Sequence, residues 1–170
     1  MADITVRALT EDEWETYRDV RLAALRESPE AFVATVDEEA AYDEDLWRTR
    51  MARSQRLLAQ VDKAPVGVVS IGRTDVEEDR TAELFGLWVH PEWRGKSVAA
   101  TLVRRGAEEA HNAGLERLAY WVGSDNGRAV AFASSFGFRP TDDRRPMRVR
   151  DGDGDEEEVA MILALGEDRG

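Results

Sequence analysis

A short basic turn joins an apolar strand to a helix near the middle of the chain. Val89 ends the apolar segment, and Arg94, Gly95, Lys96 and Ser97 precede the helix. The first amides of a helix have no partner within it, and the helix dipole adds partial positive charge beside them. Two cationic side chains and a glycine that permits close backbone approach favour a phosphate-binding site. The alternative is an ordinary strand-to-helix turn with solvated basic side chains.

One carboxylate interrupts the apolar strand that leads into this turn. Glu83 lies within residues 81–89, whose other members are mostly apolar or aromatic. A carboxylate surrounded by core residues is expected to point inward and to have a raised pKa, which makes Glu83 a candidate proton acceptor. The alternative is a glutamate on an edge strand that points to water.

Periodicity and capping signals predict the elements that lead up to these residues. Residues 4–8 alternate as a short strand, and Thr10 begins a capping box for a helix that stops before Ser28. Asp43 is expected to cap the next helix. Between these two helices, residues 29–42 are compatible with either a short helix or an irregular segment.

The rest of the chain predicts a hairpin followed by a strand-helix-strand unit. Residues 57–61 and 66–71 are apolar runs separated by a turn, which favours an antiparallel pair. The strand at 81–89 and the strand after the following helix should be parallel. In chain order, the later elements are expected to be a helix from about Ser97 to Gly114, a strand at 115–122, a helix at 127–136 capped by Asp125 or Asn126, and strands at 147–150 and 159–165.

Composition bounds the class of protein. The 170 residues, 42% of them hydrophobic and without a long apolar run, predict one globular domain over residues 1–170. The element order predicts an α+β fold, a mixed sheet with helices on both faces. The absence of cysteine excludes disulfides and thiolate catalysis. No signal-peptide or membrane-spanning pattern is present, so a cytoplasmic protein is expected.

The charges of the chain limit the classes of partner and metal that it is expected to bind. A net charge of -12 disfavours nucleic acid and favours a small cationic partner. His90 and His111 lack metal-ligand spacing. Asp151, Asp153 and Asp155 are similar to the start of a calcium loop, but the required glycine and the final glutamate are missing. No metal site is predicted.

Two segments resemble motifs of the GCN5-related N-acetyltransferases, the GNAT superfamily. Residues 94–99, Arg-Gly-Lys-Ser-Val-Ala, are similar to the family turn Arg/Gln-x-x-Gly-x-Gly/Ala. Residues 126–138 are similar to the family segment Asn-x-x-Ala-x-x-Leu/Phe-Tyr-x-x-x-Gly-Phe. The element order also matches the GNAT order over nearly the whole chain. The resemblance implies a mainly antiparallel sheet in which one splayed parallel strand pair forms the acyl-CoA cleft.

The resemblance also implies roles for particular residues. The basic turn would hold the pyrophosphate of acetyl-CoA, the backbone of the preceding strand would pair with the pantetheine amides, and Glu83 matches the position of a general base. The residues expected to bind acetyl-CoA are Leu87, Trp88, Val89, Arg94, Gly95, Lys96, Ser97, Val98, Ala99, Ala100 and Asn126.

Two residues depart from the family pattern. Ser97 stands where the family usually has glycine, and its side chain would either crowd the phosphate or donate a hydroxyl to it. Ala133 stands where many relatives have a tyrosine proposed to protonate the leaving CoA thiolate. Water, Ser134 or Tyr120 would then have to supply that proton.

The resulting hypothesis is an N-acetyltransferase that moves an acetyl group directly from acetyl-CoA to a primary amine of a small molecule or peptide, with a cationic acceptor favoured. Ser97 and Ala133 motivate the alternative of a non-catalytic acyl-CoA binding or sensing domain. No role with nucleic acid or a membrane is expected, and a homodimer is the common expectation for such folds.

Overall fold

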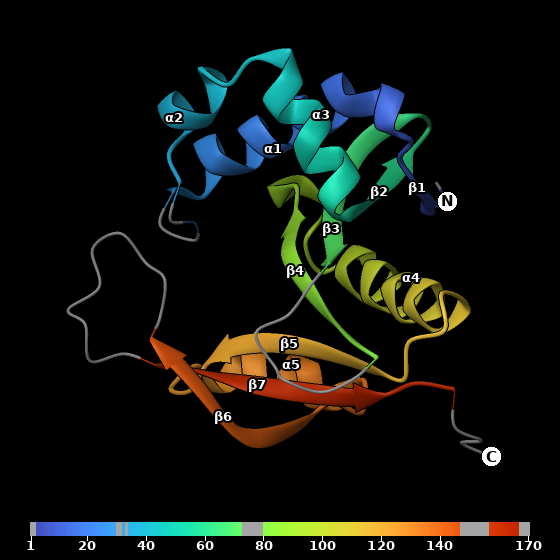
Figure 1. Cartoon of the computed structure of the whole chain (residues 1–170), viewed down its shortest axis with the longest axis vertical. Helices are drawn as coiled ribbons and strands as arrows, with labels where there is room; N and C mark the ends of the chain where they lie inside the picture. The colour runs from blue at the N-terminus through green and yellow to red at the C-terminus, as the bar shows by residue number, and fades with distance from the viewer. Residues whose placement is uncertain (1–2, 30–31, 33, 73–79, 147–156, 167–170) are drawn as a thin grey trace.

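One mixed sheet organises the chain. The computed structural model describes residues 3–29, 32, 34–72, 80–146 and 157–166. Seven strands in these ranges form the order β1-β2-β3-β4-β5-β7-β6 (Figure 1), and only the β4–β5 pair is parallel. The strands are β1 Thr5–Ala8, β2 Gln55–Val61, β3 Ala64–Gly72, β4 Thr81–Val89, β5 Arg117–Gly123, β6 Arg139–Pro146 and β7 Glu157–Ala164. The mainly antiparallel mixed sheet predicted from the sequence is confirmed.

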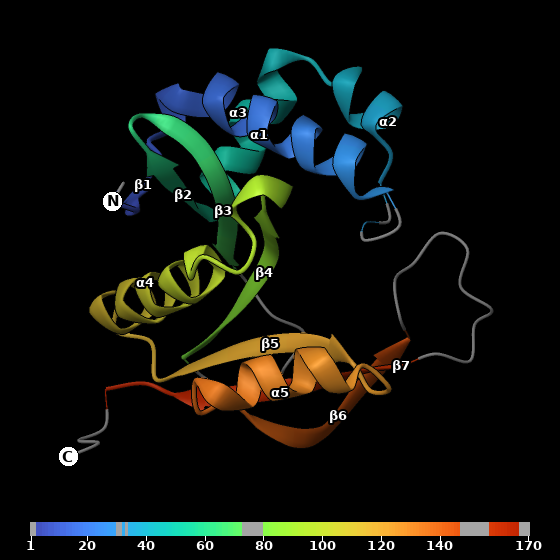
Figure 2. The same ribbon diagram turned by 180° about the vertical axis from the view of Figure 1, so that it is seen from behind.

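Helices cover both faces of the sheet. They are α1 Trp14–Glu27, α2 Val36–Ala40, α3 Glu44–Arg53, α4 Val98–Asn112 and α5 Gly127–Ser135, with 3-10 turns at Glu11–Glu13 and Pro91–Trp93. Successive strand residues point to opposite faces, so Leu57 packs in the cluster that contains α4, whereas Leu58 packs in the cluster that contains α1 and α3. Figures 1 and 2 show α1 to α3 over one part of the sheet, α4 across β3 and β4, and α5 beside β5.

The capping signals begin helices where the sequence predicts. The Glu13 carboxylate accepts a hydrogen bond from the Thr10 amide at 3.1 Å. Asp43 accepts from the Leu46 amide at 2.9 Å. Of the two candidates for the α5 cap, Asn126 is the one that accepts from the next turn, at the Ala129 amide. The open segment at 29–42 contains the short α2.

The last strands differ from the prediction. β6 runs along Arg139–Pro146 and pairs with β7, although no strand is expected there from the sequence. Its polar residues lack a period-2 pattern, and its prolines are tolerated because β6 is an edge strand. The strand predicted at 147–150 and the aspartates of the calcium-like loop lie outside the described residues.

The parallel pair β4 and β5 separates along its length. Pairing runs from Thr81 opposite Arg117 to Leu84 opposite Tyr120. Beyond that point β4 continues against β3 and β5 continues against β7, and the two strands diverge in Figures 1 and 2. A bulge with Gly86 at φ +66° bends β4 just after the separation.

The helices of the described ranges include none with the length and hydropathy needed to cross a bilayer.

Candidate active site

A cavity of about 780 Å³ lies where β4 and β5 separate. Its walls come from β4, β5, β6 and β7 on one side and from α1 and the segment around α2 on the other. Glu83, Leu87 and Tyr120 line it, together with Arg21 and Arg145. This volume is in the range of pockets that enclose a small ligand.

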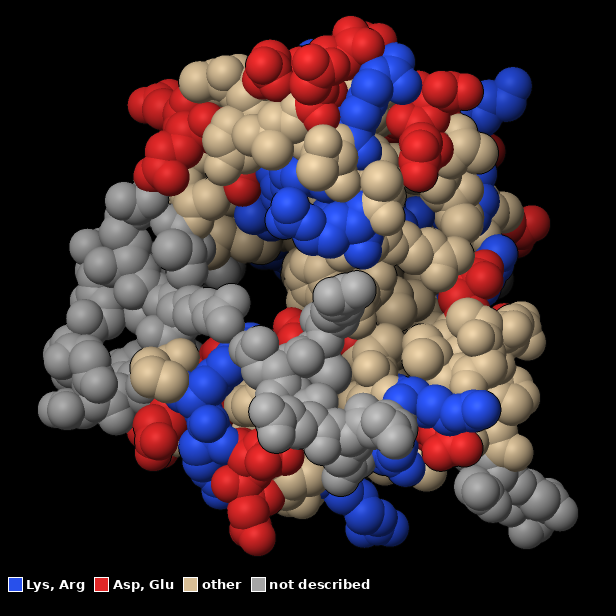
Figure 3. All heavy atoms as spheres, viewed as in Figure 1, with Lys and Arg blue, Asp and Glu red and all other residues tan. Residues whose placement is uncertain are grey.

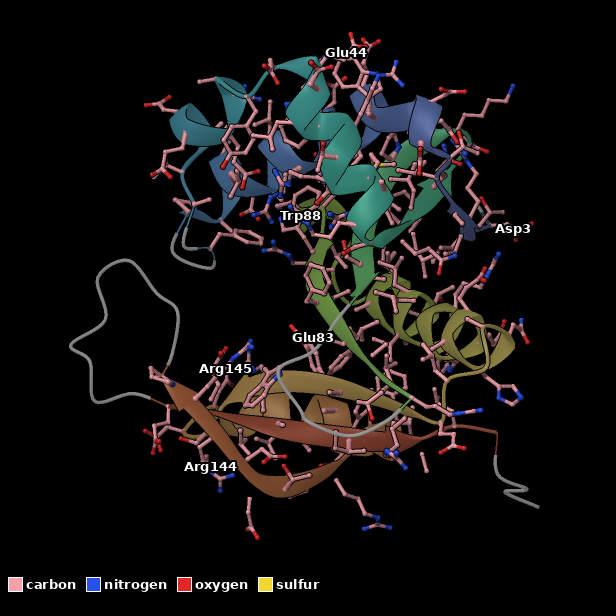
Figure 4. All side chains as sticks on the ribbon, in the orientation of Figure 1. Asp3, Glu44, Glu83, Trp88, Arg144 and Arg145 are labelled. Carbon is pink, nitrogen blue, oxygen red and sulfur yellow. The ribbon has the colours of Figure 1, made fainter. Side chains whose placement is uncertain are left out.

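Glu83 points from β4 into this cavity (Figure 4). Its side chain is 12% exposed and lies 3.9 Å from Arg145 Nη1. Arg145 also donates through Nε to Glu158 at 2.8 Å and stacks 4.2 Å from the Trp121 ring centroid. These contacts hold a cation beside the Glu83 carboxylate. The inward orientation is therefore the one that the structure supports, and not the solvent-facing alternative.

The basic turn at the far end of β4 has the backbone shape of an anion site. Gly95 and Ser97 have φ of +77° and +71°, and α4 begins at Val98. The Thr101 amide makes the first bond of this helix, to the Ser97 carbonyl at 3.0 Å. The amides of residues 98–100 therefore need acceptors from outside the helix, as an anion would provide.

Arg94 is tied to both β4 and α1. Its Nε donates to the Val89 carbonyl at 3.0 Å, and its Nη2 pairs with Glu27 at the end of α1. The same carboxylate oxygen accepts from Trp88 Nε1 at 3.2 Å. The Arg94 side chain is nonetheless 49% exposed. Arg94 thus stands beside the turn with part of its guanidinium accessible.

The other residues expected to bind a cofactor fall into separate places. Leu87 lines the cavity, whereas the side chains of Trp88 and Val89 are buried in the core, so that only their backbone is available to a ligand. Lys96 is exposed, with Nζ 5.9 Å from the Trp93 ring centroid. Asn126 is exposed at the start of α5, but its side-chain oxygen is used as the helix cap.

The residues considered as proton donors lie in different parts of the structure. Ala133 is buried in the core, and Ser134 is exposed on α5 and outside the cavity lining. Tyr120 lines the cavity directly beside the last paired position of β4. Burial raises the pKa of the Tyr120 hydroxyl, so it remains protonated at neutral pH.

Sequence reasoning missed two cavity residues, Arg21 and Arg145. Arg21 is a cation among the apolar positions of α1, which is a signal that it faces an interior site. Arg145 lies in a segment without strand periodicity, and no sequence pattern distinguishes it from Arg144, which points to the other side of β6 in Figure 4. Within the described residues, no group of three or more histidines or carboxylates is arranged to hold a metal ion.

The fold and the turn define a class of protein. The family model described as Acetyltransferase (GNAT) family matches residues 7–138. The chain belongs to this family, and the family resemblance inferred from the two motifs is confirmed.

Known proteins agree with this assignment. An uncharacterised N-acetyltransferase of Methanocaldococcus jannaschii is 23% identical over 137 residues, which cover 79% of this chain and 60% of that protein. The protein yncA from Salmonella typhimurium, solved with acetyl-CoA, has a TM-score of 0.72 and 21% identity, with 98% of this chain and 96% of that chain covered. The ribosomal-protein-S18-alanine N-acetyltransferase from Escherichia coli has a TM-score of 0.70 and 17% identity, with 97% of this chain and 96% of that chain covered.

A third solved structure, the paia N-acetyltransferase from Thermoplasma acidophilum in complex with coenzyme A, has a TM-score of 0.64 and 16% identity. It covers 96% of this chain and 99% of that chain. At these identities the structural matches establish the fold, and the α+β arrangement with one splayed parallel pair is confirmed.

Proposed function

We propose that the protein is an acetyl-CoA-dependent N-acetyltransferase that acts on a primary amine of a small molecule or peptide. The observation that carries the proposal is that one strand, β4, presents Glu83 to the cavity at one end and leads at the other into a turn with the backbone shape of an anion site. Family membership supports acetyl transfer, and relatives solved with acetyl-CoA or coenzyme A support the acyl donor.

The residues of this chain fit the donor in two ways. The amides of residues 98–100, with Arg94 and Lys96 beside them, would hold the pyrophosphate. Beyond Leu84 the β5 side of β4 is no longer paired with β5, so its backbone is available to the amides of the pantetheine arm. Arg94 donates to the Val89 carbonyl and so holds the end of β4 that leads into the turn, and a backbone amide of β4 nearer to Glu83, beside the cavity, would be the donor for the thioester oxygen.

The reaction would proceed by direct transfer. Glu83 accepts a proton from the ammonium group of the acceptor, directly or through water, and leaves a nitrogen lone pair. The nitrogen attacks the thioester carbon, and this backbone amide of β4 stabilises the oxyanion that forms. The carbon–sulfur bond then breaks, the nitrogen releases its second proton to water, and the thiolate takes a proton from the Tyr120 hydroxyl, which water then re-protonates. Most of the acceleration comes from holding the two substrates in line.

The test of the proposed function is release of free CoA thiol from acetyl-CoA in the presence of a panel of primary amines, with binding of acetyl-CoA measured by calorimetry. Thiol release that depends on the amine, together with an N-acetylated product found by mass spectrometry, supports the enzyme. Tight binding without turnover of any amine class would instead favour a non-catalytic acyl-CoA binding domain.

The Ser97→Gly variant is expected to be more stable than the parent. The left-handed backbone at Ser97 costs about 1 to 2 kcal/mol for a residue with a Cβ, and the greater freedom of glycine in the unfolded chain offsets part of that gain. We expect the free energy of unfolding to rise by up to about 1 kcal/mol in urea melts. No helix-capping bond is made by the serine side chain, so acetyl-CoA affinity should not change.

Ser97→Ala is the control for this prediction, because alanine keeps the Cβ and removes only the hydroxyl. Loss of acetyl-CoA affinity in both variants would contradict it and assign the hydroxyl to the phosphate site. A decrease in stability in the glycine variant would contradict the strain argument.

The Tyr120→Phe variant tests the proposed proton donor. We expect kcat to fall about tenfold to a hundredfold, near the low end of acid catalysis, because a thiol is a fair leaving group without assistance. The KM for acetyl-CoA should be unchanged, since Tyr120 lies in the cavity and away from the basic turn. Phe138 lies against the Tyr120 ring, so the ring of phenylalanine keeps the packing. An unchanged kcat at all pH values would assign the proton to water.

A further inference from the structure

The α1 wall of the cavity adjoins three arginines, here called the arginine cluster: Arg56, which is buried, and Arg21 and Arg50, whose side chains are each 17% exposed. Arg21 lines the cavity and donates Nε and Nη2 to the two oxygens of Glu39, at 2.9 and 3.1 Å. Arg50 Nη1 donates to the same carboxylate at 2.9 Å. Glu39, on α2, is 3% exposed. One buried carboxylate therefore serves two arginines.

The third member of the cluster has no carboxylate. Arg56 on β2 is 4% exposed, and its Nη1 and Nη2 donate to the Ser70 hydroxyl and the Arg50 carbonyl. Its Nε is buried without a hydrogen-bond partner, and the Tyr17 ring lies 4.5 Å from its guanidinium carbon. Among the described residues, no acid lies within ion-pair distance of Arg56. Burial and the neighbouring arginine charges lower the pKa of Arg56.

The arginine cluster thus carries three positive charges against the single negative charge of Glu39. Buried positive charge in excess is unfavourable unless an anion approaches it. Arg21 is the member through which an anion in the cavity can make contact, because Glu39 occupies only Nε and Nη2 and leaves Nη1 unused by the described residues. Figure 3 shows basic side chains gathered on the wall of the hollow beneath the helices.

The opposite wall has the opposite balance. Glu83 and Glu158 line it with one cation, Arg145, between them. Glu38, which is exposed, lies on α2 at the outer part of the wall that contains Arg21. A ligand that is positive at one end and negative at the other would match these two walls. Its positive end would lie at Glu83 and its negative end at Arg21.

We infer that the acceptor is an amine that also carries a carboxylate, an amino acid in the broad sense, with the carboxylate held by Arg21 and the amine presented to Glu83. The inference rests on the proposed function, since it names the substrate class of that same site. It differs from the cationic acceptor favoured by the net charge of the chain. Net charge acts over distances at which salt screens it, whereas the cavity charges touch the ligand.

The experiment compares amines that differ only in the carboxylate. The pairs are phenylalanine with phenethylamine, leucine with isopentylamine, and 4-aminobutyrate with propylamine. Thiol release is measured with the parent, Arg21→Met and Arg18→Met. Arg18 is the matched control because it lies on the same helix, pairs with the exposed Asp19 and is not part of the cavity lining. Thermal melts confirm that each variant is folded.

We expect the carboxylated member of at least one pair to have the higher kcat/KM by about tenfold or more, the contribution of a charge-assisted hydrogen bond. Arg21→Met should remove that preference by raising KM for the acid while the amine without a carboxylate is unaffected. Arg18→Met should keep it. Equal turnover within every pair, or equal loss for both members in Arg21→Met, would overturn the inference and leave the acetyltransferase intact.

A binding measurement separates this inference from the proposed function. The products N-acetylphenylalanine and N-acetylphenethylamine are titrated by calorimetry into the protein with CoA present. Tighter binding of the acid, lost in Arg21→Met, supports the carboxylate site even if no amine in the panel is acetylated. Equal affinity for the two products overturns the site, whatever the result of the activity assay.

Discussion

Replacing Glu83 with glutamine is expected to lower kcat for amine acetylation by about 10²- to 10⁴-fold, the contribution typical of a positioned general base. The variant keeps the size of the side chain, and Arg145 keeps its ion pair with Glu158, so the cavity should retain its shape. The affinity for acetyl-CoA should not change, because the basic turn lies at the other end of β4. Steady-state kinetics and calorimetry measure the two quantities.

The pH dependence makes this prediction specific to a base. At high pH a growing fraction of the amine is neutral without help, so the deficit of Glu83→Gln should shrink as pH rises. Glu116→Gln is the control, because Glu116 is exposed just before β5 and outside the cavity. A deficit that is equally large at every pH, or shared by the control, would contradict a role for Glu83 as the base.

Replacing Glu39 with glutamine is expected to reduce the free energy of unfolding by about 3 kcal/mol, as is usual when one partner of a buried ion pair is removed. The amide cannot balance Arg21, Arg50 and Arg56, which would then have no buried counter-charge among the described residues. Urea-induced unfolding at neutral pH measures the change.

The ion pairs of Glu39 with Arg21 and Arg50 also predict how the loss of unfolding free energy depends on pH. Burial by itself would raise the pKa of the Glu39 carboxyl, but hydrogen bonds and charge from Arg21 and Arg50 outweigh it and hold the pKa below its usual range. A lowered folded-state pKa stabilises the protein above the ordinary carboxyl pKa of about 4.3, and this contribution is lost as pH falls towards the folded-state value. The difference between parent and Glu39→Gln should therefore shrink in acid.

Glu44→Gln is the control for the Glu39 prediction. Glu44 pairs with Arg48 four residues along α3, with more than half of its side chain exposed. Such a surface pair contributes little, so the free energy of unfolding should be nearly unchanged. A similar loss in both variants, or a loss at Glu39 that persists unchanged in acid, would contradict the account of the arginine cluster.

Much of the fold follows from local patterns in the sequence. Thr10, Asp43 and Asn126 begin helices because each supplies a short polar side chain before an amphipathic run. β6 was not predicted from the sequence, because an exposed edge strand does not need the alternating apolar residues by which a strand is recognised. Its polar residues are placed by pairing with β7, a partner that only the folded chain supplies.

The candidate site divides in the same way. Glu83 and the basic turn are visible in the sequence because they lie on one strand and the helix that follows it. The cavity walls are not visible, because Arg21 and Arg145 are brought to Glu83 by tertiary packing from elements far apart in the chain. The net charge of the chain could not show that one wall of the cavity adjoins the arginine cluster.

The divergence of β4 from β5 has a consequence for how the chain tolerates change in length. Glu83 and the end of the strand at Val89 are separated by six residues, or about 20 Å of extended backbone less the bulge at Gly86. In the proposed mode of binding, the pyrophosphate and the thioester of acetyl-CoA would thus lie at the two ends of one continuous strand segment. Insertion or deletion of one residue within it would shift the reacting carbon by about 3.3 Å and turn Glu83 to the opposite face. In the proposed mode of binding, substitutions can vary the walls around the acceptor, whereas the length of this segment must match the length of the donor.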